Sequence, residues 1–237
     1  MSRLPVHSGA DIRLADAFDQ PGCPLCRERS RQESALLESI LAESVNDVGF
    51  RATLDAGRGF CGPHSRAVLA ADRRRAGSLG AAILLRATLR VRLQELETAH
   101  AARGRSRARA ASHATAPPAC PVCARLAASD RWLADGLVAL AEDAAWAAAV
   151  AGAPFCLDHL LRLMDRRSVP AWWPPVEARQ LARLADIRDR LEGYAHASAH
   201  DRRHLQTDAQ RASVDEAADL LGGATGPRDG RADRGAG

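Results

Sequence analysis

The six cysteines of this chain fall into a repeated pattern that restricts the folds open to it. A Cys-Pro-x-Cys motif occurs twice, beginning at Cys23 and at Cys120, and a Phe-Cys-x-x-His motif follows each copy. Residues 27–60 separate Cys26 from Cys61 in the first copy, and residues 124–155 separate Cys123 from Cys156 in the second, so order and spacing nearly repeat. We therefore treat the chain as two related segments, each organised around its own pair of motifs.

Each motif is a turn that presents two metal ligands from one place on the backbone. Cys-x-x-Cys offers two thiolates, Cys-x-x-His offers a thiolate and an imidazole, and four such ligands suit tetrahedral zinc. The sequence predicts two zinc ions per chain, one in each segment. The first ion is expected to be held by Cys23, Cys26, Cys61 and His64, and the second by Cys120, Cys123, Cys156 and His159.

The composition favours an all-α fold made of two tandem, related helical units. Apolar residues make up 46% of the chain and aromatic residues only 4%, and the prominent alanine and leucine favour helices. In a helix expected over residues 78–103, leucines recur at three- and four-residue steps, and we expect them to form core. These leucines are Leu85, Leu89, Leu93 and Leu96. A long final helix is expected to open at Pro174 and Pro175, which suit a first helical turn.

The ligand motifs of one segment can meet only if the chain doubles back between them. A single helix of about 34 residues would hold its ends about 50 Å apart, at about 1.5 Å per residue. In the first segment Asn-Asp-Val-Gly, residues 46–49, supplies a helix stop and a new N-cap. In the second segment residues 141–143 stand at the corresponding place without a strong helix breaker.

This pattern divides the chain into four parts. The first helical unit is expected over residues 12–103 and the second over residues 119–205. Residues 104–118 are rich in Arg, Ala and Ser and end in two prolines, which predicts a linker. Residues 206–237 end in a stretch rich in Gly and Arg and are expected to form a disordered tail.

The charged residues and the apolar segments exclude several classes of function and location. All 33 basic residues are arginine, which excludes lysine nucleophiles, and the net charge of +4 does not imply a dominant nucleic-acid surface. The N-terminal segment lacks the apolar run of a secretory signal, and the most apolar stretch, residues 132–152, carries three acidic residues. We expect a cytoplasmic protein with no membrane partner, in which reduced cysteines hold metal rather than form disulfides.

Other interpretations of the motifs stay open at this point. Three cysteines and one histidine could hold an iron–sulfur cluster instead of zinc. Cys-Pro-x-Cys also occurs in glutaredoxin-like redox motifs, although the βαβ pattern that accompanies them is not found in the sequence. Four protein ligands leave no open position for catalysis, so a non-enzymatic role is favoured, with Asp158 a weak candidate for a general base.

Two weaker signals concern partners. His196, His200 and His204 would share one helix face, and could bind a further metal, if the final helix extended so far. Alternate arginines from Arg103 to Arg109 could contact nucleic-acid phosphates, although no aromatic residue is interleaved for stacking. We therefore expect an interaction or regulatory module with an unidentified protein partner, with nucleic acid as an alternative. A thiol/redox or metal sensor is the rival function.

The motifs resemble those of an uncharacterised bacterial family, a domain of unknown function. The resemblance extends over about residues 12–205 and rests on Cys-Pro-Leu-Cys, a Val-Asn-Asp turn, Gly-Phe-Cys-x-x-His and a second, looser copy. The matching residues are Cys23, Leu25, Cys26, Val45, Asn46, Asp47, Gly59, Phe60, Cys61 and His64, then Cys120, Cys123, Phe155, Cys156 and His159. The resemblance implies the metal ligands and no activity. Pro154 replaces the family's glycine in the second copy, so the backbone there is expected to differ.

Overall fold

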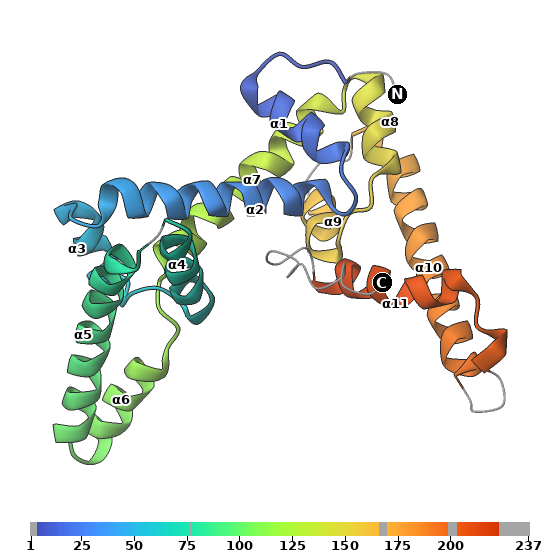
Figure 1. The fold of residues 1–237 in the computed structure, drawn as a ribbon. Helices are drawn as coiled ribbons and strands as arrows, with labels where there is room; N and C mark the ends of the chain where they lie inside the picture. The colour runs from blue at the N-terminus through green and yellow to red at the C-terminus, as the bar shows by residue number, and fades with distance from the viewer. Residues whose placement is uncertain (1–3, 76, 166–169, 199–202, 223–237) are drawn as a thin grey trace. The chain divides into compact units, whose positions relative to one another are not determined.

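The structure is a computed structural model that describes residues 4–75, 77–165, 170–198 and 203–222. Within these ranges the chain forms helices joined by loops and has no strand, which confirms the predicted all-α fold (Figure 1). None of the helices in these ranges combines the length and the apolar character needed to cross a membrane. The elements are α1 (Gly9–Phe18), α2 (Pro24–Ser39), a π-helical turn η1 (Ile40–Ser44), α3 (Val48–Ala56), α4 (Gly62–Arg74), α5 (Leu79–Ala101), α6 (Gly104–Thr115), α7 (Pro121–Leu140), α8 (Ala144–Gly152), α9 (Leu157–Met164), α10 (Trp173–Ala197), a 3₁₀ turn η2 (Arg203–Leu205) and α11 (Asp208–Gly222).

The chain divides into two compact units, of which the first is discontinuous in sequence. Unit 1 consists of residues 1–30 and 130–237, and unit 2 of residues 31–129. The boundaries fall inside α2 and α7, so each of these helices contributes residues to both units. The compact units therefore differ from the sequence segments 12–103 and 119–205.

Unit 1 is built around Trp146 of α8, whose side chain is fully buried. Its ring meets Phe18 of α1 edge to face, with the ring centroids 5.6 Å apart, and its Nε1 donates a hydrogen bond of 2.8 Å to the backbone oxygen of Pro5. Helix α10 packs against α8 and α11, and it begins with prolines in its first turn, as predicted.

Unit 2 has a core of fully buried side chains from three helices, with Leu54 on α3, Val68 on α4 and Leu84 on α5. Arg58, just after α3, connects these helices to α6. Its guanidinium donates hydrogen bonds to Glu95 of α5 and to the backbone oxygens of Ala114 and Ala116, the last two at 3.1 and 2.9 Å. One side chain therefore joins the end of α3 to both α5 and α6.

Two segments that were predicted to be irregular are helical. Residues 104–115 of the predicted linker form α6, which returns along α5 as a helical hairpin (Figure 1). Residues 208–222 of the predicted disordered tail form α11, which packs on α10 through Ile187, Ala217 and Leu220. Both predictions were wrong because alanine-rich polar sequences form helices when a neighbouring helix covers one face. Residues 223–237 lie outside the described residues.

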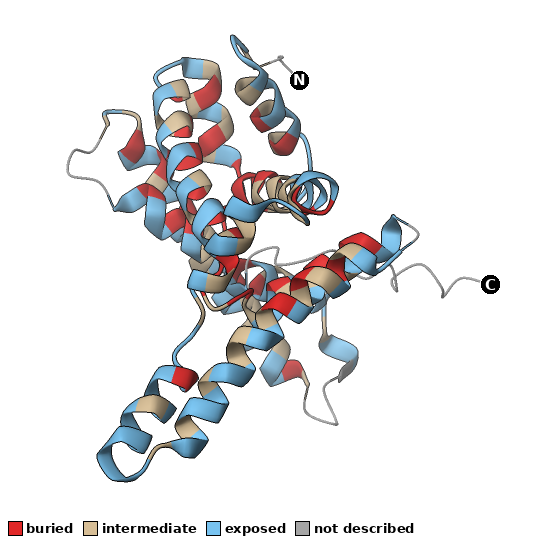
Figure 2. Cartoon of the chain, turned by 90° about the vertical axis from the view of Figure 1, so that its left-hand side faces the viewer, coloured by how far each residue is buried: buried red, intermediate tan, exposed pale blue. Residues whose placement is uncertain are grey.

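The leucines of α5 also differ from the prediction that they form core. Leu89, Leu93 and Leu96 have exposed fractions of 67%, 52% and 60%. Helix α5 extends beyond α3 and α4, and its later turns, which pack against α6, are largely exposed in Figure 2. Helical periodicity identified this apolar face correctly, but periodicity carries no information about whether another element covers it.

Candidate metal centres

The eight predicted ligands meet in two groups of four. In each group the ligand atoms all lie within 4.8 Å of one another. The first group lies in unit 1, is buried throughout and is called the buried group: Cys23, Cys26, Cys156 and His159. The second group lies in unit 2 and is called the half-open group, because one cysteine is half-buried and another exposed: Cys61, His64, Cys120 and Cys123.

This grouping contradicts the prediction that each ion takes all its ligands from one sequence segment. Each group combines the Cys-Pro-x-Cys motif of one segment with the Cys-x-x-His motif of the other. Helix lengths supply the reason. Helix α2 with η1 carries the chain forward by about 30 Å, whereas α3, with nine residues, returns it by only about 13 Å. Helices α7 and α8 have 20 and nine residues, so the second segment has the same imbalance.

Aspartate N-caps make the turn in both segments. In the first segment the side chain of Asp47 accepts a hydrogen bond from the backbone N–H of Phe50, as the helix-stop sequence predicts. In the second segment Asp143 accepts hydrogen bonds of 2.8 and 3.2 Å from the backbone N–H groups of Ala145 and Trp146. Asp143 is thus the turn signal that the sequence interpretation missed, and it is an ordinary helix N-cap residue.

The interatomic distances in both groups suit a single tetrahedral ion. The histidine Nδ1 lies 3.1–3.5 Å from each of the three sulfur atoms of its group. The sulfur atoms of Cys26 and Cys156 are 3.5 Å apart, and those of Cys61 and Cys123 are 3.7 Å apart. Zinc bonds of about 2.3 Å to sulfur and 2.0 Å to nitrogen give tetrahedron edges of about 3.5–3.8 Å. The ligand atoms therefore already stand near the corners that such an ion requires.

Every ligand motif opens a helix. The first hydrogen bonds of α2, α4, α7 and α9 are accepted by the backbone oxygens of Cys23, Cys61, Cys120 and Cys156. The first cysteine of each motif is therefore an N-cap, and the second ligand lies in the first helical turn. Two helix N-termini meet at each group, where their positive ends stabilise thiolates. Pro24 and Pro121 occupy the first helical positions, where the missing N–H costs little, as predicted.

Hydrogen bonding within the groups shifts the pKa values of the ligands. Burial alone would raise the pKa of Cys120, but hydrogen bonds from His64 and from backbone N–H groups lower it to about 6. Hydrogen bonds with neighbouring sulfur atoms raise the pKa of Cys26 and lower that of Cys156. Burial lowers the pKa of His159, but hydrogen bonds to Cys156 and Cys23 raise it to about 10. Each group therefore contains one cysteine with a lowered pKa, Cys156 or Cys120, and the thiolate that this favours is the form that binds a metal ion.

The two histidines differ in what their second ring nitrogen contacts. Nε2 of His64 lies 3.3 Å from a carboxylate oxygen of Glu33 on α2. In metal sites such a carboxylate orients the ring and makes the ligand more basic. Nε2 of His159 is buried and has no hydrogen-bond partner among the described residues. Glu33 was not identified from the sequence, because its distance from either motif gives no sign that α2 brings it beside His64.

Two glycines near the half-open group lie where a larger residue would collide with a neighbouring segment. Gly59 has a φ of +93°, and a Cβ there would lie 2.2 Å from the side chain of Thr88. A Cβ on Gly57 would lie 2.4 Å from the backbone oxygen of Ala119, the residue before Cys120. Gly57 is therefore required where the two ligand motifs of this group approach each other.

The second Cys-x-x-His motif has nearly the same backbone as the first despite Pro154. The φ and ψ angles are −69° and 166° at Cys61, and −73° and 162° at Cys156. Helix α8 is followed by Ala153 in an extended conformation, and the backbone N–H of Phe155 donates to the oxygen of Ala153 at 3.1 Å. The difference expected after Pro154 is therefore absent at Cys156, the first ligand of the second motif.

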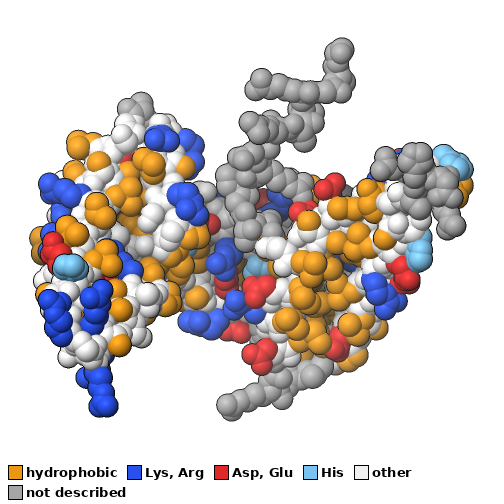
Figure 3. Space-filling view, turned by 90° about the horizontal axis from the view of Figure 1, so that it is seen from below, with side chains coloured by type: hydrophobic (Ala, Val, Ile, Leu, Met, Phe, Trp, Pro, Cys, Tyr) orange, Lys and Arg blue, Asp and Glu red, His pale blue; other side chains and the backbone are white. Residues whose placement is uncertain are grey.

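The remaining sequence signals do not form a further site among the described residues. Asp158 is exposed and accepts a hydrogen bond of 3.0 Å from Arg162. The condition for a shared histidine face is not met, because α10 ends at Ala197 and His204 lies on η2; His200 is outside the described residues. Arg103 is the N-cap residue of α6 and the other alternate arginines lie on this helix, where alternate positions point in different directions. On the face in Figure 3, basic side chains lie in separate patches among apolar ones.

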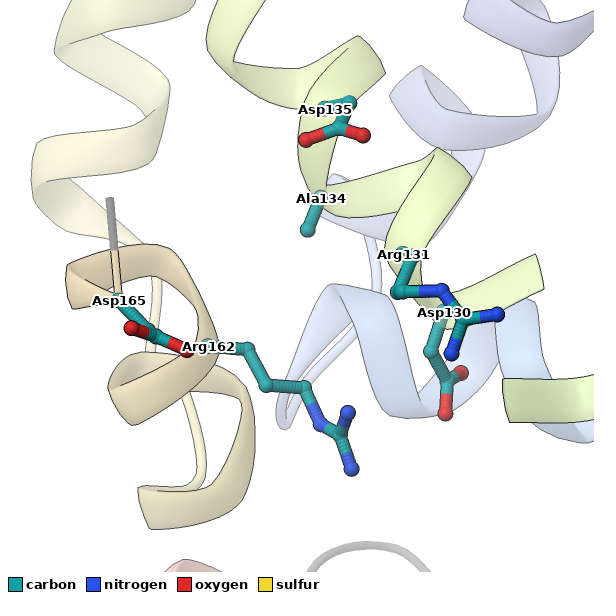
Figure 4. A pocket seen from close by; sticks show the side chains of 6 residues that line it. All are labelled: Asp130, Arg131, Ala134, Asp135, Arg162 and Asp165. Atoms are coloured by element: carbon teal, nitrogen blue, oxygen red, sulfur yellow. The ribbon is translucent and has the colours of Figure 1, made fainter. Parts of the chain in front are cut away.

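A pocket of about 270 Å³ in unit 1 lies between α7 and α9. Figure 4 shows Arg162 extending from α9 towards α7, and the pocket is also lined by Asp130, Asp135 and Asp165. Asp130 is buried and forms an ion pair with Arg29. The pocket is smaller than the roughly 300–1,000 Å³ of typical small-molecule sites.

Fold and ligand geometry together define an all-helical protein in which two Cys₃His groups could hold metal ions. Residues 8–169 match the model of a protein family described as a family of unknown function, DUF6062. The match covers more than half of the chain and all eight ligands, and the chain belongs to this family. No curated protein and no solved structure matches the chain.

Proposed function

We propose that this protein is a non-enzymatic interaction or regulatory module whose helical units are held in shape by two structural zinc ions. The observation that carries the proposal is the closure of both ligand sets, each with three sulfur atoms and one nitrogen within 4.8 Å. A structural zinc site uses all four positions for protein ligands, whereas a catalytic site keeps one position open for water or substrate.

The types of ligand atom and the short distances between them support zinc over magnesium, calcium or an iron–sulfur cluster. Thiolates and imidazole suit zinc, whereas magnesium and calcium take oxygen ligands. All four ligand atoms of each group lie within 4.8 Å of one another, which supports one ion rather than an iron–sulfur cluster, whose ligands are divided between different iron atoms.

Each ion would join parts of the chain that are distant in sequence. Cys26 and Cys156 are 130 residues apart, and Cys61 and Cys123 are 62 residues apart. Because unfolded chains do not hold such ligands together, the free energy of zinc binding is added to that of folding, of order 10 kcal/mol in small peptides. The units therefore depend on the ions for their stability.

Metal analysis of the native protein, purified without added metal, tests this proposal. We expect two zinc ions per chain and no visible absorption, and chelation should lower both helical circular dichroism and the melting temperature. Iron with absorption in the visible range would contradict the choice of zinc. Metal removal without loss of stability would contradict the structural role.

The interaction part of the proposal is supported by the exposed apolar stripe of Leu89, Leu93 and Leu96 on α5. A helical segment of a protein partner would cover such a stripe with its own apolar face. Nucleic acid is the alternative partner, and retention on DNA or RNA that weakens with rising salt would favour it. Retention that does not respond to salt would rule it out.

A further inference from the structure

We infer that the half-open group is an oxidation site, at which Cys123 and Cys61 form a disulfide and release one zinc ion while the buried group retains its ion. This inference rests on the proposed zinc sites and assigns them different chemistry. The observation behind it is the unequal burial of two otherwise similar groups: Cys123 is exposed and Cys61 half-buried, whereas every ligand of the buried group is buried.

Sulfur proximity does not distinguish the two groups. The sulfur atoms of Cys26 and Cys156 are 3.5 Å apart in the buried group, and those of Cys61 and Cys123 are 3.7 Å apart in the half-open group. Both pairs are close enough to react after a small movement, so access of the oxidant decides which pair is oxidised.

The surroundings of Cys61 and Cys123 leave that access open. The next residue after Cys61 is Gly62, and a Cβ built there would meet no atom within 4 Å. The corresponding position in the buried group is Leu157, which is half-buried, and the exposed fraction of Cys156 is only 2%. Cys123 is itself exposed, so a small oxidant in solution can approach this pair, whereas the corresponding pair in the buried group is enclosed.

We expect Cys123 to form its disulfide with Cys61 and not with Cys120. Both lie in the same group, but the exposed fraction of Cys120 is 2%, and its backbone oxygen begins α7. Cys61 is half-buried, belongs to a different helix and lies 3.7 Å from Cys123 through its sulfur atom. A disulfide between these two residues would join the starts of α4 and α7, the same connection that the ion makes.

The chemistry balances with a peroxide as oxidant. The thiolate of Cys123 attacks one peroxide oxygen, which forms a sulfenic acid and releases hydroxide as the O–O bond breaks. The thiolate of Cys61 then attacks the Cys123 sulfur, which forms the S–S bond and releases a second hydroxide. Two sulfur atoms lose two electrons in all and the peroxide gains them. Zinc is left with only His64 and Cys120 and dissociates, and a thiol reductant reverses the change.

The test treats the full-length zinc protein with hydrogen peroxide and follows zinc release with a chromogenic chelator. We expect one of the two zinc ions to be released at least about tenfold faster than the other, because exposure governs thiolate oxidation. Alkylation of the remaining thiols, followed by peptide mass spectrometry, should locate a Cys61–Cys123 disulfide. Hydrogen exchange should quicken within residues 31–129 and stay slow around Cys26 and Cys156. The chelator-treated, denatured chain is the control, in which all six cysteines should react alike.

Two kinds of failure can be told apart. Fewer than two zinc ions before treatment would contradict the proposed function itself. Two ions at the start, followed by equal release rates, no release, or a disulfide at Cys120 or in the buried group, would overturn the oxidation site alone.

Discussion

Glu33 is the residue that distinguishes the surroundings of the two histidine ligands. Its carboxylate lies 3.3 Å from Nε2 of His64, whereas Nε2 of His159 has no such partner among the described residues. We predict that Glu33→Gln weakens zinc binding at the half-open group by about 10- to 100-fold, because the imidazole loses a basic, orienting partner. Competition with a chelator of known affinity measures this change.

The buried group and a second glutamate provide the controls for this substitution. Zinc affinity at the buried group should not change in Glu33→Gln. Glu38→Gln changes an exposed glutamate of the same helix and should leave both affinities as they are. Equal weakening by both substitutions would show that the charge of α2, rather than contact with His64, is responsible.

The residues that sequence reasoning found differ in kind from those it missed. The eight ligands were recognisable because their chemistry requires fixed local spacings, which a sequence displays directly. Glu33 and Gly57 act through contacts with residues distant in the chain, His64 and Ala119. Such contacts exist only after folding, so no local pattern marks them.

At the scale of elements, Gly57 and Gly152 occupy matching positions at the ends of α3 and α8. Substitution of Gly152 therefore serves as the matched control for substitution of Gly57. Gly57→Ala should destabilise the protein by about 1–3 kcal/mol, because the added Cβ collides with the backbone oxygen of Ala119. The Cβ added by Gly152→Ala would meet no atom within 4 Å, so this substitution should be neutral or should stabilise the protein by about 0.5–1 kcal/mol. Urea unfolding of the zinc-loaded proteins measures both, and equal effects would contradict the requirement for glycine at residue 57.

Arg58 connects α3, α5 and α6, and its pairing with Glu95 can be measured as a coupling energy. Replacing them by Arg58→Met and Glu95→Gln, singly and together, should reveal a coupling of about 1–2 kcal/mol at neutral pH. The hydrogen bond from Arg58 lowers the pKa of Glu95, so this stabilisation is present above the unfolded-state pKa and is lost as pH falls through the lowered value.

An exposed ion pair supplies the control for this cycle. Arg188 and Asp189 are paired on the surface of α10, where solvent screens their attraction. Arg188→Met should change the unfolding free energy by less than about 0.5 kcal/mol. A coupling between Arg58 and Glu95 no larger than this effect would show that the residues around α6 are held by other contacts.

Helices were predictable from the sequence where leucines recurred at helical steps or where prolines marked a first helical turn. The helix expected over residues 78–103 corresponds to α5, and the one expected to open at Pro174 corresponds to α10. Helices α6 and α11 were missed because their sequences resemble a linker and a polar tail, and packing against α5 and α10 decides their conformation.

At the scale of the whole molecule, the ligand motifs pair across the two sequence segments. Spacing identifies a ligand turn but does not say which second turn shares its ion. That choice depends on helix lengths: about 30 Å outward along α2 and η1 against about 13 Å back along α3 keeps the two motifs of one segment apart. Each compact unit thus contains one complete group only because it draws on both segments.

Zinc content of two fourfold variants tests this crossed pairing most directly. In the first variant, serine replaces Cys23, Cys26 and Cys156 and alanine replaces His159, which removes the buried group alone. In the second, serine replaces Cys23, Cys26 and Cys61 and alanine replaces His64, which damages both groups. We predict one zinc ion per chain in the first variant and none in the second. The reverse result would show that each ion binds within one segment, and would contradict the crossed arrangement.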